Sequence, residues 1–327
     1  MRLGRAAAVT DTGRRRLRNE DAFVCEPPLF AVTDGMGGAR AGEIAAELAA
    51  TALEEGAGQT HGTDALVALV EEANRRIWQR SVEDPRTTGM GAVATVALVD
   101  EGTGTVAIGH VGDSRGYLLR DGAIEQLTRD HSLVAELVES GVLTPEEAEH
   151  HPQRSAITRA LGTEPEVEVD AFTVDGRPGD VFLLCSDGLS AMVADEALAV
   201  TIEAEKRDLE RAADALVAAA NARGGEDNIT VVLFELLQAA DGVADEAALP
   251  AAAGEPMAPD PAEPASLPTE VDKPEPVPEP DSPEETETAP PEARRHGAGP
   301  GGRIAALLLL AALLAIAILA LYTGINR

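Results

Sequence analysis

The sequence changes character at about residue 240, and this change limits which part of the chain can fold. Residues 241–292 hold 15 acidic residues against one basic residue, Lys273, and 13 of the chain's 21 prolines lie between Pro250 and Pro291. Such a segment has too few apolar side chains to bury a core, and its like charges repel one another. We therefore expect an extended, disordered linker over residues 241–303 and a folded domain over residues 1–240.

The apolar run at 304–322 has 19 residues and no charge. A helix of this length spans roughly 30 Å, which matches the hydrocarbon core of a bilayer. The alternative is a buried helix of a soluble domain, but the acidic linker leaves no domain in which to bury it. Arg294, Arg295 and Arg303 precede the run and Arg327 follows it. This asymmetry predicts a single-pass transmembrane helix in the cell membrane, with the folded domain in the cytoplasm.

The formal net charge of −31 argues against a nucleic-acid partner, because such a chain repels a phosphate backbone. An anionic substrate suits it only where bound cations reverse the local field. The two cysteines, Cys25 and Cys185, lie in apolar stretches and are expected to be reduced and buried. Two cysteines are too few for a cysteine-based zinc site, and no N-terminal apolar segment is long enough for a signal peptide.

Apolar periodicity within residues 1–240 alternates between strands and helices. Short apolar runs predict strands at 22–26, 29–33, 91–100, 104–119, 181–188 and 228–236. Helical spacing of apolar residues predicts amphipathic helices at 40–55, 64–80 and 207–222, and a helical part at 131–150. This order of elements suits sheets that are covered by helices.

Four aspartates lie at the ends of these strand candidates. Asp34 follows LFAVT, Asp113 follows VAIGHVG, Asp187 follows VFLLCS, and Asp227 precedes NITVVLF. A single Asp-Gly pair usually marks a turn, so it is the recurrence that carries the signal. If the strands are neighbours, the four carboxylates converge at one edge of the sheet.

Converging carboxylates repel one another unless a cation lies between them. Carboxylate, carbonyl and water oxygens suit Mg²⁺ and Mn²⁺, and the six histidines show no HExxH spacing that would favour zinc. Two such ions about 4 Å apart are a standard device for hydrolysing phosphate esters. The residues therefore favour metal-assisted hydrolysis of a phosphate ester.

Seven motifs then occur in order along residues 4–237: RRRLRNEDAF, FAVTDGMGGARAGE, HVGDSRGYLLRDG, LTRDHSLV, ITRALGT, LLCSDGLS and GGEDNITVVLF. Together they resemble the bacterial branch of the metal-dependent PPM/PP2C serine/threonine phosphatases. The resemblance implies an α+β fold, a four-layer α-β-β-α sandwich of two antiparallel sheets flanked by helices.

The resemblance also implies roles for individual residues. Asp34 would bridge two metal ions, and the Gly35 carbonyl would contact one of them. Asp187 and Asp227 would complete the shell of the other ion. The remaining implied contributors to the metal shells are Glu20, acting through a water ligand, Asp21, acting as support, and Asp113 with Ser155 at a third ion. The expected cofactors are thus two Mn²⁺ or Mg²⁺ ions, with a place for a third.

Arg16 stands three residues before Asn19-Glu20-Asp21 and so matches the family's phosphate-binding arginine, although the adjacent Arg14 and Arg15 leave the register open. A guanidinium fork suits two phosphate oxygens. Met36 stands where eukaryotic relatives carry a histidine proposed as general acid, so water at the metals would have to protonate the leaving alkoxide. His131 is expected to cap or orient the segment that follows it, and Asn228 to hold the Asp227 loop.

The resemblance implies hydrolysis of phosphoserine and phosphothreonine in proteins, by a water or hydroxide that bridges the two ions. The expected partners are phosphorylated proteins and the Ser/Thr kinases that the enzyme would oppose, with the membrane as anchor and a monomer as the oligomeric state. A non-enzymatic scaffold that binds phosphoproteins is one alternative, but loss of Asp34, Asp187 or Asp227 would have signalled it. A hydrolase of small phosphate esters also stays open.

Overall fold

The computed structural model describes residues 1–37, 41–58, 60–205 and 208–239. The predicted linker at 241–303 and the predicted transmembrane helix at 304–322 both lie outside these residues. Within the described part of the chain, no helix is both long enough and apolar enough to cross a membrane.

Two five-stranded sheets form the centre of the described unit, and every strand pairing in them is antiparallel. The first sheet consists, in spatial order, of β1 (Arg2–Asp11), β10 (Ile229–Leu237), β9 (Val181–Cys185), β6 (Arg115–Arg120) and β7 (Ala123–Gln126). The second consists of β2 (Asp21–Glu26), β3 (Leu29–Met36), β4 (Gly91–Asp100), β5 (Thr105–Val111) and β8 (Asp170–Asp175).

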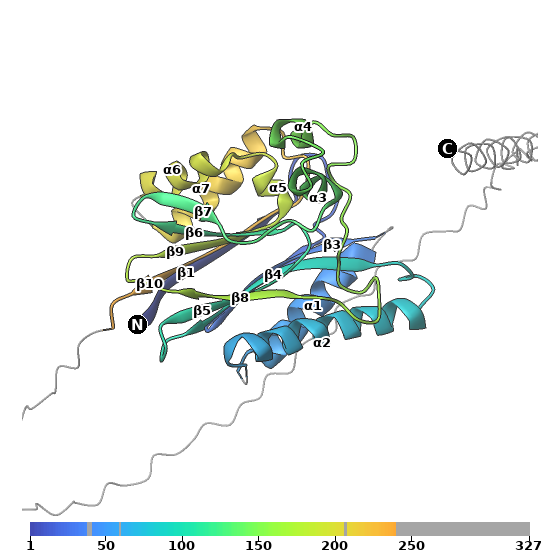
Figure 1. Cartoon of the computed structure of the whole chain (residues 1–327), viewed down its shortest axis with the longest axis horizontal. Helices are drawn as coiled ribbons and strands as arrows, with labels where there is room; N and C mark the ends of the chain where they lie inside the picture. Colours follow the sequence, from blue (N-terminus) through green and yellow to red (C-terminus); the bar gives the residue numbers. More distant parts are fainter. Residues whose placement is uncertain (38–40, 59, 206–207, 240–327) are drawn as a thin grey trace, which may run out of the picture. The chain divides into compact units, whose positions relative to one another are not determined.

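Helices cover the outer face of each sheet, as Figure 1 shows. The second sheet is covered by α1 (Ala41–Ala57) and α2 (Gly62–Glu83), and the first by α6 (Asp195–Ala204) and α7 (Leu209–Ala222). Three short helices complete the described unit: α3 (Leu133–Glu139), α4 (Pro145–Glu149) and α5 (Asp187–Ser190). The predicted α+β class, with two antiparallel sheets flanked by helices, is confirmed.

The alternation of side chains along β3 explains how one strand serves two cores. Leu29 and Ala31 pack under the helices, whereas Phe30 and Val32 point to the other sheet. Between the sheets, the Phe30 ring stacks on Phe234 with centroids 4.2 Å apart. Four phenylalanines, Phe30, Phe172, Phe182 and Phe234, thus lie where the two sheets meet, whereas Ala, Val, Leu and Ile make up most of the layers under the helices.

The predicted strands and helices are present, with two shifts that matter for the site. The strand predicted to end at residue 33 runs to Met36, so Asp34 lies within β3. The strand predicted over 181–188 ends at Cys185, and Asp187 instead begins α5. The predictions missed β1, β7, β8 and α6. In β1 the alternation is weak because Gly4 and Arg5 are followed by three consecutive alanines, and β8 is a short strand bounded by Asp at both ends.

Candidate metal centre

Five aspartates come together at one end of the sandwich, and we call them the acidic cluster: Asp21, Asp34, Asp113, Asp187 and Asp227. Asp21 and Asp34 are directly opposite each other in the β2–β3 register. Asp113 lies in the connection from β5 to β6, which passes from one sheet to the other. Asp187 and Asp227 belong to the first sheet's side, after β9 and before β10.

This placement corrects the prediction of a single sheet edge. The strands that lead to Asp34 and Asp113 belong to the second sheet, and those beside Asp187 and Asp227 belong to the first. The carboxylates meet because the ends of two packed sheets meet. Apolar periodicity shows where a strand ends but not which sheet it joins, so the sequence pattern could not make this distinction.

Asp21 ties the two sheets together within the acidic cluster. Its Oδ2 accepts hydrogen bonds from the Ser186 hydroxyl at 2.8 Å and from the Thr230 hydroxyl at 2.6 Å, both on the first sheet's side. Its other oxygen, Oδ1, is buried and has no hydrogen-bond partner among the residues that the structure describes, and the same holds for Oδ1 of Asp187. Buried carboxylate oxygens without partners are expensive, which indicates that a ligand completes them.

The protonation of the acidic cluster reflects crowding of like charge. Removal from water raises the pKa of Asp34 well above its usual value, and the neighbouring Asp21, Asp187 and Asp113 raise it further. Burial, followed by repulsion from Asp113 and Asp227, raises the pKa of Asp187 to about 8. Burial also raises the pKa of Asp21 and of Asp113 to about 6. Each of these shifts is what a divalent cation would reverse.

A second group of oxygens converges beside Gly42, near the start of α1. A Cβ on Gly42 would lie 2.6 Å from Glu20 Oε2 and 2.7 Å from the Gly35 carbonyl oxygen. A Cβ on Gly35 would lie 2.0 Å from the Gly42 carbonyl oxygen. The two glycines therefore allow the backbones of β3 and α1 to approach, and this approach brings a carboxylate and a carbonyl oxygen together.

Arg16 reaches the acidic cluster from the exposed loop after β1. Its Nη2 donates to Asp227 Oδ2 at 2.6 Å, while the side chain remains half exposed. Burial alone would lower the pKa of Arg16, but the charge and hydrogen bond of Asp227, together with the charges of Asp34 and Glu20, outweigh it and the pKa is raised. The guanidinium is thus a permanent positive charge at the rim of a negative site.

The comparisons with known proteins agree with this geometry. The family model described as protein phosphatase 2C matches residues 12–233. The serine/threonine phosphatase stp of Listeria monocytogenes is 42% identical over 240 residues, which cover 69% of this chain and 93% of that protein. The chain belongs to the protein phosphatase 2C family. The family and relatives at about 40% identity together support a protein serine/threonine phosphatase.

Solved structures extend the comparison of this protein phosphatase 2C member. The crystal structure of the Mycobacterium tuberculosis phosphatase PstP/Ppp has a TM-score of 0.68 and 40% identity, and covers 72% of this chain and 100% of that chain. A second structure, the catalytic domain of PstP in complex with two manganese ions, has a TM-score of 0.66 and 38% identity, and covers 72% of this chain and 99% of the other. These neighbours support dependence on Mn²⁺ or Mg²⁺.

The residues of this protein phosphatase 2C member fit such ions by their chemistry. The acidic cluster and the oxygens beside Gly42 are hard oxygen donors, and two buried carboxylate oxygens lack partners. As the side chains stand, no three His, Cys, Asp or Glu residues in the described ranges are grouped so that they could hold one ion. Asp227 Oδ2 accepts a hydrogen bond from Arg16 at 2.6 Å and so already has a partner.

The remaining predicted residues have different environments. Glu20 is partly buried, and burial raises its pKa. Ser155 is exposed in the turn after α4, and its side chain makes no hydrogen bond among the residues that the structure describes. Met36, at the end of β3, is partly buried. Cys185 is buried as expected, but Cys25 is only half-buried, because it lies on the edge strand β2; both are free thiols.

Asn228 does more than the predicted hold on the Asp227 loop. Its backbone N–H donates to Asp227 Oδ1 at 2.8 Å. Its side-chain amide donates to the carbonyls of Thr12 and Arg18, and its Oδ1 accepts from the Glu20 N–H at 2.8 Å. One buried amide therefore fixes the loop that carries Arg16 and Glu20. The sequence signal was its position next to Asp227, but the bonds span about 210 residues of chain, which no local pattern shows.

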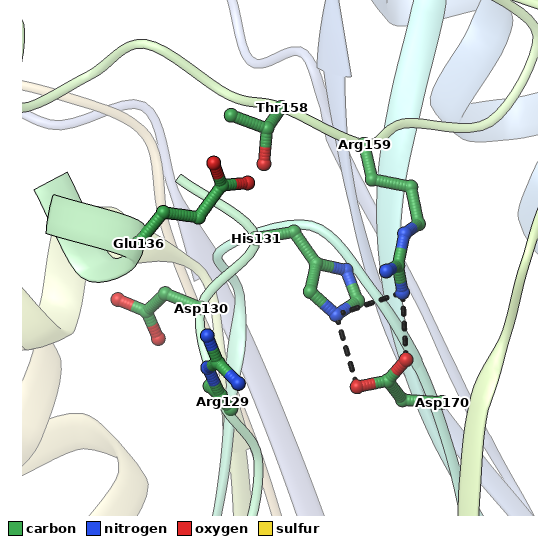
Figure 2. A pocket seen from close by; sticks show the side chains of 7 residues that line it. All are labelled: Arg129, Asp130, His131, Glu136, Thr158, Arg159 and Asp170. Carbon is green, nitrogen blue, oxygen red and sulfur yellow. Dashed lines mark hydrogen bonds and ion pairs between the residues drawn. The ribbon is translucent and has the colours of Figure 1, made fainter. Parts of the chain in front are cut away.

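A second polar cluster lies beside the acidic cluster, in the pocket drawn in Figure 2. In it, His131 faces Asp170, with Nε2 and Oδ2 3.1 Å apart, and Arg159 donates to Asp170 Oδ1 at 2.6 Å. The other ring nitrogen of His131, Nδ1, accepts from the Gly112 N–H at 3.0 Å, and the His131 N–H donates to the Gly112 carbonyl at 2.6 Å.

These contacts correct the expected role of His131. The segment that follows is capped by Ser132, which accepts from the Ala135 N–H at the start of α3. His131 instead holds Gly112, the residue before Asp113. Because Nδ1 is an acceptor, the proton of the neutral ring lies on Nε2 and points to Asp170. The pocket around His131 therefore holds the backbone next to Asp113, at one end of the acidic cluster.

Proposed function

We propose that the acidic cluster is the catalytic centre for Mn²⁺- or Mg²⁺-dependent hydrolysis of phosphoserine and phosphothreonine in proteins. The observation that carries this proposal is the pair of buried, unpartnered carboxylate oxygens of Asp21 and Asp187 within a cluster of five aspartates. Membership of the protein phosphatase 2C family and the manganese complex of a structural neighbour support it.

The chain offers ligands for two ions. Asp34 would serve both ions, the Gly35 carbonyl would help to hold one, and Asp187 and Asp227 would help to hold the other. Glu20 would act through a water ligand. Its carboxylate and the Gly35 carbonyl oxygen both lie against the Cα of Gly42. Asp21 supports the cluster through its bonds to Ser186 and Thr230. Asp113 would hold a third ion, and Ser155 would join it only if its turn approaches.

When bound, the two ions supply an activated water nucleophile and neutralise charge on the phosphoryl oxygens. The chain's own contribution is orientation. Arg16 exchanges its bond to Asp227 for the substrate phosphate, whose oxygens its fork can contact in pairs. Because Met36 has no proton to donate, the leaving alkoxide takes its proton from water.

The direct test measures phosphate release by the full chain from p-nitrophenyl phosphate and from phosphoserine and phosphothreonine peptides, with Mn²⁺ or with a chelator. We expect hydrolysis only with the metal, and its loss in Asp34→Asn. Asp64→Asn, an exposed carboxylate on α2, serves as the matched control and should behave as the wild type. Full turnover in Asp34→Asn would rule out the proposed centre, and turnover of p-nitrophenyl phosphate alone would indicate small phosphate esters as substrates.

We further propose that residues 304–322 anchor the protein in the cell membrane, with the catalytic unit in the cytoplasm, where it opposes Ser/Thr kinases. The support is the uncharged 19-residue run and the arginines before it. Deleting residues 297–327 should release the protein from sedimented membranes without loss of hydrolysis. Continued sedimentation of the truncated protein would show that this run is not the anchor.

A further inference from the structure

The loop of residues 14–18, which we call the arginine loop, combines charge and apolar exposure beside the acidic cluster. Its sequence, RRRLR, holds four of the chain's 26 basic residues, and all five side chains are exposed. Leu17 is 99% exposed, more than any other large apolar side chain that the structure describes. Scattered exposed leucines are common, so the exposure of Leu17 gains meaning only from its setting.

The arginine loop is held in place by bonds at both ends. The Arg14 N–H donates to the Gly225 carbonyl at 2.7 Å, and the Arg18 carbonyl accepts from the buried Asn228 side chain at 2.8 Å. Asn228 also binds the Thr12 carbonyl at 3.0 Å. The loop is therefore fixed against the segment around Asp227, and its outward side chains are displayed in a defined place.

The charges of the arginine loop are only partly neutralised. Arg16 pairs with Asp227, and Arg18 lies 3.9 Å from Glu43. Arg14 and Arg15 have no ion pair within the described part of the chain, although Arg14 adds a minor share to the lowered pKa of Asp11. The chain has 57 acidic and 26 basic residues, so two arginines without ion pairs make the arginine loop unusually positive for this protein.

We propose that the arginine loop docks the polypeptide of the phosphorylated substrate, through acidic residues and an apolar residue that flank the phosphorylated side chain. This inference rests on the proposed function. Arg16 reaches the acidic cluster from the middle of the loop, so Arg15 and Leu17 adjoin the residue that receives the phosphate. An extended peptide advances about 3.3 Å per residue, which places residues within about three positions of the phosphorylated one against the loop.

An anionic membrane offers the same chemistry of negative charge beside apolar groups. The position of the loop favours the peptide, because a bilayer lying on it would cover the adjoining acidic cluster and block protein substrates. A substrate chain that enters the cluster must instead pass the loop. Charge complementarity with acidic flanks then gives the phosphatase a preference that the metal centre alone would not have.

The test compares phosphothreonine peptides that carry Glu and Leu beside the phosphorylated residue with peptides that carry Gln and Ser there. Hydrolysis is measured with the full chain, Mn²⁺ and the variants Arg14→Gln/Arg15→Gln and Leu17→Ala. Arg86→Gln and Val200→Ala are matched controls, because both residues are exposed and belong to other parts of the fold. Hydrolysis of p-nitrophenyl phosphate, which has no flanking residues, reports on the metal centre alone.

We expect the acidic, leucine-containing peptide to have a KM about fivefold lower, as two exposed charge pairs would give. Arg14→Gln/Arg15→Gln should remove the part of this KM difference that depends on charge, and Leu17→Ala should reduce the part that remains. The control variants should leave the KM difference unchanged. High salt should also reduce the preference, because screening shortens the reach of exposed charges. Hydrolysis of p-nitrophenyl phosphate should stay at the wild-type rate in every variant.

Equal KM values for both peptides, or a preference that survives in the variants, would overturn the docking proposal while p-nitrophenyl phosphate hydrolysis upholds the metal centre. If the arginine substitutions change only the binding of the chain to phosphatidylserine rather than phosphatidylcholine vesicles, the loop is a membrane contact and the proposal is wrong. Absence of hydrolysis of any of these substrates would overturn the proposed function, and this inference with it.

Discussion

Two polar clusters lie side by side in this protein, and they solve the problem of buried charge in opposite ways. The acidic cluster contains only carboxylates, and two of its buried oxygens have no hydrogen-bond partner within the described part of the chain. The pocket around His131 contains charges of both signs, and Arg159 and His131 both contact Asp170 (Figure 2). Opposite charges that pair within a cluster can stabilise the fold. Like charges that repel one another within a cluster require a bound cation.

The pKa values of the two clusters show the same contrast. In the acidic cluster, burial and like charges raise the pKa of Asp34 and Asp187. In the pocket, burial would raise the pKa of Asp170, but His131 and Arg159 outweigh it and the pKa is lowered. Burial is the largest cause of the raised pKa of Asp34 and Asp187, whereas Asp170 is less deeply buried and has two basic neighbours, so depth and neighbours together separate a carboxylate that holds the fold from one that suits a cation.

The largest expected effect follows from neutralising one member of the acidic cluster. Asp187→Asn should reduce turnover of a phosphothreonine peptide on the order of 1,000-fold, because an ion loses a charged ligand. The same change should raise the metal-free free energy of unfolding, because it removes repulsion. Urea unfolding in a chelator, beside kinetics with Mn²⁺, measures both. A variant that is both inactive and less stable would contradict the self-repelling description.

Backbone packing beneath the acidic cluster should give the next largest effect. In Gly35→Ala the new Cβ would lie 2.0 Å from the Gly42 carbonyl oxygen, so β3 and α1 would have to separate. We expect a loss of about 3 kcal/mol in the free energy of unfolding, within the range for overpacking. Gly58→Ala is the matched control, since nothing lies within 4 Å of its Cβ position. Equal stability of the two variants in urea unfolding would show that the approach is not needed.

The two clusters should also give opposite pH slopes in the metal-free protein. Asp187 has a pKa of about 8 when folded against 3.8 as its ordinary value, so the folded state holds its proton more tightly. The contribution of Asp187 to the free energy of unfolding should therefore fall as the pH rises from about 4 to about 8. Added Mn²⁺ should flatten this slope. A slope that is unchanged by Mn²⁺ would separate the carboxylates from metal binding.

Between about pH 4 and 6.5, His110, which is buried on β5 with its ring centroid 4.8 Å from that of His131, contributes a slope of the opposite sign. Burial, followed by the charge of His131, lowers the pKa of His110 to about 4 from 6.5, so the unfolded chain binds the proton more tightly. Stability from this group is complete above about pH 6.5 and is lost as the pH falls toward 4. His110→Gln should reduce this loss in urea unfolding measured across that range. An unchanged acid slope would assign the loss to other groups.

The smallest expected effect comes from the pocket. Asp170→Asn leaves the shape of the pocket but weakens the contacts with His131 and Arg159, so we expect a loss of about 1 kcal/mol in stability. Turnover should fall by less than tenfold, because His131 acts on Asp113 only through Gly112. Asp175→Asn, an exposed change on the same strand, is the control. A loss of activity as large as that of Asp187→Asn would place the pocket within the catalytic centre.

The sequence predicted the elements that have strong periodicity and the aspartates that end them. It predicted α1 and α2 from helical spacing, and Asp34, Asp113, Asp187 and Asp227 from repeated strand ends. It did not predict that these residues come from two sheets, because side-chain alternation is the same in either sheet. The resemblance to a family supplied the antiparallel pairing that periodicity left open.

The residues missed by sequence reasoning act through backbone contacts between distant segments. Gly42 permits the approach of Glu20 to the Gly35 carbonyl, and Asn228 holds the arginine loop from about 210 residues away. A glycine at a helix start and an asparagine after an aspartate are both common in loops. Their roles depend on the packing of the whole domain, so a local pattern could not reveal them.

The central claim is that the acidic cluster holds two divalent ions, and the most direct measurement counts them. Equilibrium dialysis of the chelator-treated full chain against Mn²⁺ gives the number of ions bound per chain. We predict two or more for the wild type and for Asp64→Asn, and fewer than two for Asp34→Asn, whose carboxylate both ions share in the proposed arrangement. Binding of no more than one ion by the wild type, or equal binding by Asp34→Asn, would contradict the account.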